Sequence, residues 1–92
     1  MINYHEIMGN RPFKLIRDNY PSYITWEREC ENLFEILTFY PCGLPTYNLC
    51  YWIMKNDGTK ECIANYIGGD LAKRLGETAY EQMQANNFAF TI

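Results

Sequence analysis

Apolar residues dominate two runs near the middle of the chain, Asn48 to Lys55 and Lys60 to Ile67. Residues 56–59, Asn-Asp-Gly-Thr, join them, and Asp-Gly supplies the two positive φ angles of a tight hairpin turn. Short apolar runs bounded by turn residues are typical of strands, so the pattern predicts a β-hairpin. Apolar side chains fall on both of its faces, and each face must therefore be covered by the rest of the chain or by a partner.

The register of this hairpin depends on its loop. With Asp57-Gly58 as the turn, the expected cross-strand pairs are Lys55 with Lys60, Ile53 with Cys62, Tyr51 with Ala64, and Leu49 with Tyr66. A three-residue loop ending in Gly58 would shift the register by one residue and exchange the partners.

A different spacing precedes the hairpin. Five residues recur at steps of four, three, four and three: Trp26, Cys30, Leu33, Leu37 and Tyr40. Such steps are typical of one face of an α-helix. The spacing predicts a helix that begins at Ser22 or Thr25 and ends at Tyr40, before Pro41 and Gly43, with its apolar face on the hairpin.

A second helix is expected after the hairpin, from Leu71 to Ala85, with Asp70 as its N-cap. Its expected inner stripe is Ala72, Leu75, Ala79 and Met83. Residues 88–92, Phe-Ala-Phe-Thr-Ile, alternate and predict a strand beside the hairpin. In Met1 to Met8, apolar and polar residues alternate only weakly. This segment is therefore expected to be either a short edge strand or an irregular arm.

These elements predict one α+β domain over residues 1–92, in the order helix, β-hairpin, helix, strand. The antiparallel sheet has three strands, or four if the N-terminal arm joins it. With 48% apolar and 21% charged residues, the composition is that of an ordinary globular protein.

No motif for catalysis, metal binding or a cofactor is apparent, and we expect a protein that is not an enzyme. The chain has one histidine, His5, and four cysteines without close spacing: Cys30, Cys42, Cys50 and Cys62. The predicted register places Cys50 and Cys62 on opposite faces, which argues against a disulfide. A small enzyme or a small-ligand-binding protein is an alternative that would rest on a Cys42–His5 pair or on the Gly68-Gly69 turn before a helix.

The first predicted helix would carry Glu27, Glu31 and Glu35 one turn apart on a single face, with Arg28 as the one nearby cation. A solvated surface explains such a face, and an acidic strip that docks on a basic surface is the functional alternative. The 15 aromatic residues exceed what a core of this size comfortably buries. Tyr20, Tyr23 and Trp52 are therefore expected, with the three glutamates, to contact a protein partner.

The leading hypothesis is a non-catalytic protein-binding module, an inhibitor or adaptor of a larger protein. The chain has no valine, one serine, nine asparagines, nine isoleucines and eight tyrosines, a usage that favours AT-rich codons and a phage or mobile-element gene. The expected target is then a host defence nuclease with a basic groove, in the manner of small anti-CRISPR and anti-restriction inhibitors, in the host cytoplasm. This suggestion rests on size alone.

The runner-up hypothesis is a nucleic-acid-binding protein that uses Arg11, Lys14 and Arg17 with the nearby tyrosines. The net charge of −3 argues against general binding of phosphate backbones. No signal peptide or membrane span is predicted. A homodimer built on one hairpin face is compatible with each of these functions.

Overall fold

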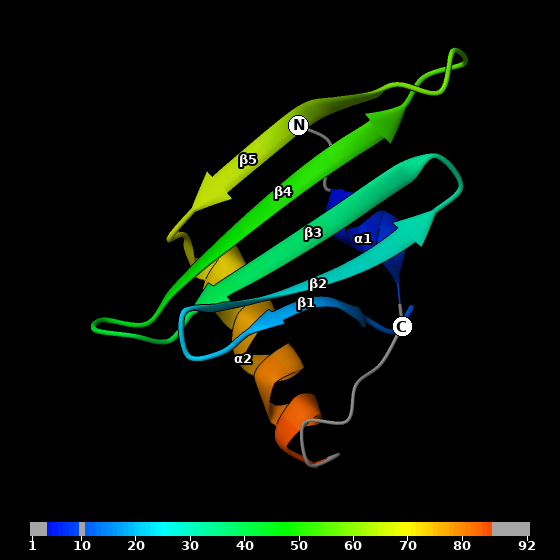
Figure 1. The fold of residues 1–92 in the computed structure, drawn as a ribbon. Coiled ribbons are helices and arrows are strands. Elements are labelled where there is room, and N and C mark those ends of the chain that lie inside the picture. Colours follow the sequence, from blue (N-terminus) through cyan, green and yellow to red (C-terminus); the bar gives the residue numbers. More distant parts are fainter. Residues whose placement is uncertain (1–3, 10, 86–92) are drawn as a thin grey trace.

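The computed structural model describes residues 4–9 and 11–85 of the chain, and within them it is an α+β fold, as predicted. In chain order its elements are α1 (Tyr4–Met8), β1 (Lys14–Asn19), β2 (Tyr23–Cys30), β3 (Leu33–Tyr40), β4 (Thr46–Met54), β5 (Lys60–Ile67) and α2 (Asp70–Ala85). The five strands form one antiparallel sheet in the order β1-β2-β3-β4-β5, so each strand pairs with its neighbour in sequence (Figure 1). The expectation of three or four strands was too low.

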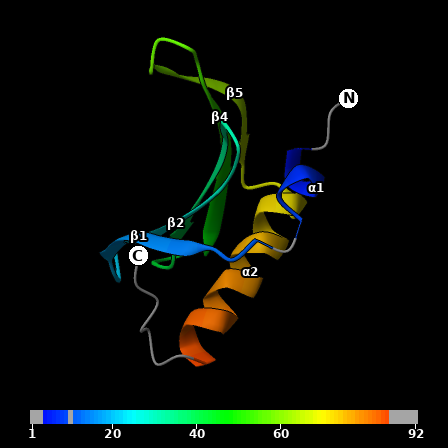
Figure 2. The same cartoon turned by 90° about the vertical axis from the view of Figure 1, so that its right-hand side faces the viewer.

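Both helices lie on the same side of the sheet, as Figure 2 shows with the sheet seen near its edge. Helix α2 packs against β3 and β4, and α1 lies beside β2. We call the helix-covered side of the sheet the inner face and the opposite side the outer face.

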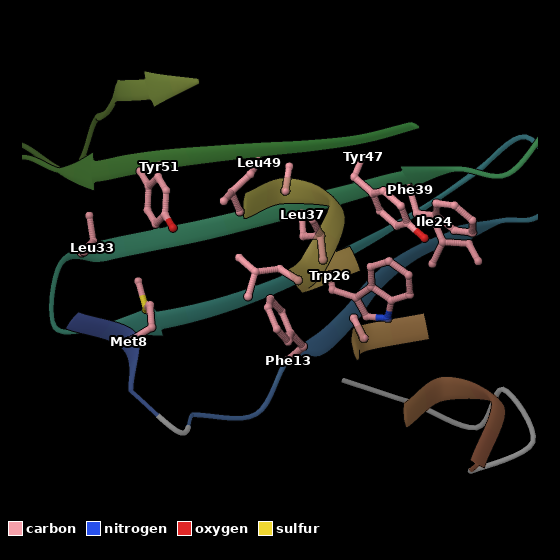
Figure 3. Close-up of a cluster of buried hydrophobic side chains, with 13 residues drawn as sticks. Met8, Phe13, Ile24, Trp26, Leu33, Leu37, Phe39, Tyr47, Leu49 and Tyr51 are labelled. Carbon is pink, nitrogen blue, oxygen red and sulfur yellow. The ribbon is translucent and has the colours of Figure 1, made fainter. Parts of the chain in front are cut away.

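The core lies between the inner face and α2 (Figure 3). Its strand residues are Ile24, Trp26, Leu33, Leu37, Phe39, Tyr47, Leu49 and Tyr51, its α2 residues are Ala72, Leu75 and Ala79, and Met8 and Phe13 join from the N-terminal segment. Alternate positions of β2, β3 and β4 supply the strand side chains because successive residues point to opposite faces of a sheet.

The predicted hairpin, β4–β5, lies where the sequence places it, but only part of its register is as expected. Leu49 pairs with Tyr66 and Tyr51 with Ala64. Nearer the loop, the pairs are Trp52–Cys62, Ile53–Glu61 and Met54–Lys60, with a bulge between the two regions. The cause is a three-residue loop that ends at Gly58, which has a φ of 88°.

The predicted first helix was wrong, because Tyr23 to Tyr40 forms the β2–β3 hairpin around Glu31-Asn32. Trp26, Cys30, Leu33 and Leu37 do share one face, as the helical spacing suggested. They share it because Cys30 pairs with Leu33 and Trp26 with Leu37, so a two-residue turn keeps all four on the inner face.

Helix α2 confirms the second predicted helix, with Ala72, Leu75 and Ala79 buried. At its centre Gly76 lies against the Tyr47 ring, where a Cβ atom would come within 1.7 Å of Tyr47 Cδ1. The N-terminal segment forms the short helix α1, so the alternatives of an edge strand and an irregular arm were both wrong for residues 4–8. The predicted strand at residues 88–92 lies outside the described residues.

Candidate functional site

The outer face combines aromatic, aliphatic and polar side chains. Its apolar members, placed by the cross-strand pairs, are Tyr23, Phe34, Ile36, Tyr40, Trp52, Met54 and Ile67. Tyr40 is 39% exposed and Ile67 is 71% exposed. Phe34 is buried but does not belong to the main core, and the Lys60 ammonium lies 4.0 Å from the centre of the Phe34 ring. The described helices lie on the other face, so Tyr40 and Ile67 are the apolar members most accessible to a partner among the described residues.

The aromatic residues expected at an interface occupy different positions. Tyr23 is half-buried on the outer face, with its ring centre 6.1 Å from that of Tyr40. Trp52 is half-buried on the same face, between Phe34 and Cys62 in the pairing. Tyr20 is 54% exposed in the turn between β1 and β2. Tyr23 and Trp52 therefore share a surface, and Tyr20 lies at its margin.

The three glutamates do not form a strip on a helix, and the structure corrects that prediction. Glu27 is half-buried on the outer face of β2, and Glu31 is exposed in the β2–β3 turn. Glu35 is fully buried on the inner face, because its position in β3 has the opposite parity to that of Phe34. Glu29, which was not predicted, is exposed on the outer face near Glu27.

Acidic side chains lie among the three cations of the predicted nucleic-acid segment. Lys14 pairs in register with Glu27 on the outer face. A pocket of about 260 Å³ at the start of β1 is lined by Arg11 and Lys14 together with Glu27 and Glu29. Mixed charge of this kind does not favour a phosphate backbone, and it also means that the glutamates are not without nearby cations.

Arg17 lies apart from that pocket, on the outer face beside Tyr23. Its Nη1 donates to the Tyr23 hydroxyl over 3.5 Å. This hydrogen bond lowers the pKa of Tyr23, because it favours the ionised phenol.

The structure separates Cys42 and His5, so the alternative of a Cys–His pair was wrong. Cys42 donates from Sγ to the Pro21 carbonyl over 3.1 Å, beyond the end of β3. His5 contacts Glu35, which lies five residues, or roughly 17 Å of strand, before Tyr40, whereas Cys42 lies beyond Tyr40. Gly68, with a φ of 67°, donates to the Tyr47 carbonyl and makes the turn before α2.

The bulge in β4–β5 also changes the relation between two cysteines. Cys62 pairs with Trp52, so it shares the outer face with Cys50, where the sequence predicted opposite faces. Both are free thiols, and burial raises the pKa of Cys50. Among the described residues, no group of three histidine, cysteine or acidic side chains is placed to hold a metal ion.

A buried polar cluster on the inner face is the feature that sequence reasoning missed. Glu35 Oε1 accepts from Arg28 Nε, and Glu35 Oε2 accepts from the Tyr51 hydroxyl over 2.6 Å. His5 Nδ1 lies 3.2 Å from Oε2. The hydrogen bonds from Arg28 and Tyr51 offset the cost of placing a carboxylate where its exposure is zero.

Arg28 links this cluster to the N-terminal segment. Its Nη1 donates to the Gly9 carbonyl over 3.3 Å and to the Arg11 carbonyl over 3.1 Å, and its Nη2 lies 2.7 Å from His5 Nδ1. The guanidinium carbon also lies 4.5 Å from the Phe13 ring centre. One side chain thus ties α1 and the start of β1 to the sheet.

Tyr51 keeps its proton in this environment. Burial is the main cause that raises its pKa far above the ordinary value of 10.0, and the hydrogen bond to Glu35 adds to it. Because Tyr51 and Glu35 are buried, the cluster is suited to stabilise the fold and to fix the positions of the side chains around it. His5, whose side chain is 28% exposed, and Arg28 are the members that line a pocket.

One feature of the sequence indicates part of this cluster. Arg28 and Glu35 carry opposite charges at positions that face each other if Glu31-Asn32 is a two-residue turn. That signal can be used only once the segment is recognised as a hairpin.

Comparisons of the chain with models of protein families, with curated proteins and with solved structures gave no match. Neither described helix is long and apolar enough to span a membrane.

Proposed function

We propose that this protein is a non-catalytic binding protein that docks on a larger protein through the outer face of its sheet. The observation that carries the proposal is the one-sided arrangement of the fold. Both described helices cover the inner face, while Tyr40 and Ile67 are exposed on the other. Exposed aromatic and aliphatic side chains gathered on one surface are typical of protein interfaces.

Charge near this surface supports a partner with a basic patch. Glu27 and Glu29 lie on the outer face, and Glu31 is exposed in the adjoining turn. Carboxylates at the edge of an apolar surface select a partner of complementary charge and speed its approach. A nuclease with a basic groove, the target expected from the sequence, has this chemistry.

The test is a capture experiment with a matched pair of Ile→Glu variants. Ile67→Glu introduces a charge on the outer face, and Ile7→Glu introduces the same charge on α1, where Ile7 is 45% exposed. Tagged wild type and both variants are incubated with lysate of the native host, and bound proteins are quantified by mass spectrometry. The dominant bound protein is then purified and titrated against all three.

We expect wild type and Ile7→Glu to hold the same protein with equal affinity, and Ile67→Glu to hold it at least about tenfold more weakly. Equal binding by all three proteins would overturn the proposal, as would capture of nucleic acid alone. A homodimer in light scattering that Ile67→Glu dissociates would assign the outer face to a second copy of the chain and equally overturn it.

The acidic residues need their own variant. A Glu27→Lys, Glu29→Lys double variant reverses two outer-face charges, and circular dichroism checks its fold because Glu27 is half-buried and pairs with Lys14. It should weaken binding of the purified partner and reduce its salt dependence. Glu35 must be left out, since reversing a buried, paired carboxylate would unfold the protein and abolish binding for an unrelated reason.

A further inference from the structure

A pocket of about 430 Å³ lies on the inner side of the molecule, between the α1–β1 connection and α2. Its lining includes His5, Arg11, Phe13, Arg28, Leu75 and Thr78. We propose that this pocket binds a small organic carboxylate with an apolar body. The pocket lies on the other side of the sheet from the outer face, so this inference does not rest on the proposed docking function.

The hydrogen bonds of Arg28 leave one donor for a ligand. A guanidinium has five N–H groups. One goes to Glu35, two go to the Gly9 and Arg11 carbonyls, and one goes to His5. Among the described residues the fifth, on Nη2, has no partner, although the side chain is only 5% exposed. A buried cationic donor at the wall of a pocket favours an acceptor with negative charge.

His5 offers a second donor. Arg28 can only donate, so at 2.7 Å His5 Nδ1 must accept, and a neutral ring then carries its proton on Nε2. The contact of the same nitrogen with Glu35, at 3.2 Å, is longer and does not reverse this assignment. The described residues give Nε2 no partner, and His5 lines the pocket.

Arg11 completes the polar side of the pocket. Its Nη1 is engaged with the Ile7 and Met8 carbonyls at the end of α1, which fixes the guanidinium in place. Its Nη2 has no protein partner among the described residues. A fixed arginine with a free amino group is suited to hold one oxygen of a carboxylate.

The charge balance favours a single negative charge on the ligand. Among the described residues, the pocket lining contains no carboxylate. Beneath it, Glu35 offsets the charge of Arg28, and His5 is neutral in the assignment above. Arg11 also lines the pocket that contains Glu27 and Glu29, so the net positive charge available to a ligand is small, and a monoanion matches it better than a phosphate with two charges.

Apolar side chains form the remaining walls. Phe13 and Leu75 belong to the core and are almost fully buried, so the walls are rigid. The volume lies within the range of small-molecule sites, which combine apolar walls with a few fixed polar groups. An aromatic or branched carboxylate would place its charged end at Arg11, Arg28 and His5 and its body against these walls.

Benzoate, with benzamide as its uncharged counterpart, is the probe for the test. Binding is followed by two-dimensional NMR of the full chain, in which the amides of Gly9, Phe13 and Leu75 should shift. Arg11→Gln removes the Arg11 charge from the pocket lining. Arg17→Gln removes the same charge from the outer face and serves as the control.

We expect benzoate to bind in the millimolar range, benzamide at least about tenfold more weakly, and Arg11→Gln to weaken benzoate by about tenfold while Arg17→Gln leaves it unchanged. If Arg11→Gln proves unfolded, Thr78→Trp fills the pocket from an exposed position of α2 and should abolish the shifts. Equal binding of benzoate and benzamide would overturn the proposal. So would the absence of binding, shifts elsewhere on the molecule, or equal losses in the two arginine variants.

Discussion

Arg28 and Glu35 face each other directly across β2 and β3, and the guanidinium donates to the carboxylate although neither side chain is more than 6% exposed. An opposite-charge pair in direct cross-strand register stabilises a hairpin. Here it lies on the inner face, where a single charge would be costly. The effect on stability of a substitution at Arg28 should therefore depend on the residue present at position 35, and the reverse.

Loss of either partner alone should destabilise the fold strongly. Arg28→Met leaves the Glu35 carboxylate without its cation, and Glu35→Leu leaves a buried guanidinium, so each should cost about 3–5 kcal/mol in the free energy of unfolding. The double variant removes both charges and should cost about 1–3 kcal/mol less than the sum of the singles. Urea denaturation of the four proteins measures this coupling, and strictly additive losses would show that the pair acts as two independent residues.

The Tyr51 hydroxyl should contribute to stability at neutral pH. Tyr51→Phe removes the 2.6 Å hydrogen bond and leaves Glu35 Oε2 without a donor, which should cost about 1–3 kcal/mol. Tyr40→Phe removes a hydroxyl from an exposed ring and is the control, with an expected change close to zero. Similar unfolding midpoints for Tyr51→Phe and wild type would contradict the hydrogen bond.

Alkaline pH should reveal the raised pKa of Tyr51. The folded state keeps the phenol proton, while an unfolded tyrosine loses it near its ordinary pKa of 10.0. The unfolded state therefore binds fewer protons above this pH, and stability should fall there as pH rises, by about 1.4 kcal/mol per pH unit for this group. Tyr51→Phe removes this contribution, so the difference in stability between wild type and variant should shrink between pH 10.0 and higher values. A constant difference would show that Tyr51 ionises normally.

The sequence predicts the parts of this fold whose local signals agree. In β4–β5 the turn residues and the apolar runs point to the same structure. In α2 the apolar stripe and the acidic first turn do so as well, although the helix begins at Asp70 itself and the residue before it, Gly69, accepts the first helical hydrogen bond. The segment from Tyr23 to Tyr40 gave conflicting signals. Its inner positions repeat with helical steps across a turn, and Arg28 and Glu35 break the apolar alternation that would have indicated two strands.

The candidate sites were predictable only to the extent that the hairpins were. Tyr23, Trp52 and Glu27 could be placed at a surface from the sequence, and they share the outer face. The inner pocket depends on His5, Arg28 and Leu75, which come together from α1, β2 and α2. Contacts between such distant positions follow from the tertiary fold, and no local pattern carries them.

The turn between β2 and β3 should be improved by glycine. Glu31 has a φ of 56°, a left-handed conformation that costs a residue with a Cβ about 1–2 kcal/mol. Glu31→Gly relieves this strain, but glycine also makes the unfolded chain more flexible, which favours unfolding. The free energy of unfolding should therefore rise by about 0.5–1 kcal/mol. Glu31→Lys changes the charge but retains the strain, and it should show no gain in thermal denaturation. A loss of stability in Glu31→Gly would mean that the Glu31 side chain makes a stabilising contact.

The close approach of α2 to the sheet should make Gly76 intolerant of any side chain. Alanine is the better helix former by about 1 kcal/mol, so an exposed glycine in a helix is usually improved by this substitution. At Gly76 the added Cβ would meet the Tyr47 ring at 1.7 Å, and Tyr47 is itself stacked on Phe39 with 4.6 Å between ring centres. The ring cannot move without disturbing the core, so Gly76→Ala should destabilise by about 1–3 kcal/mol or more. Gly69→Ala is the control, because nothing lies within 4 Å of its added Cβ and its backbone needs no positive φ; as the residue that precedes α2, it should cost only about 0.5–1 kcal/mol. If Gly76→Ala were as stable as Gly69→Ala, α2 would have to lie farther from β4 than the structure places it.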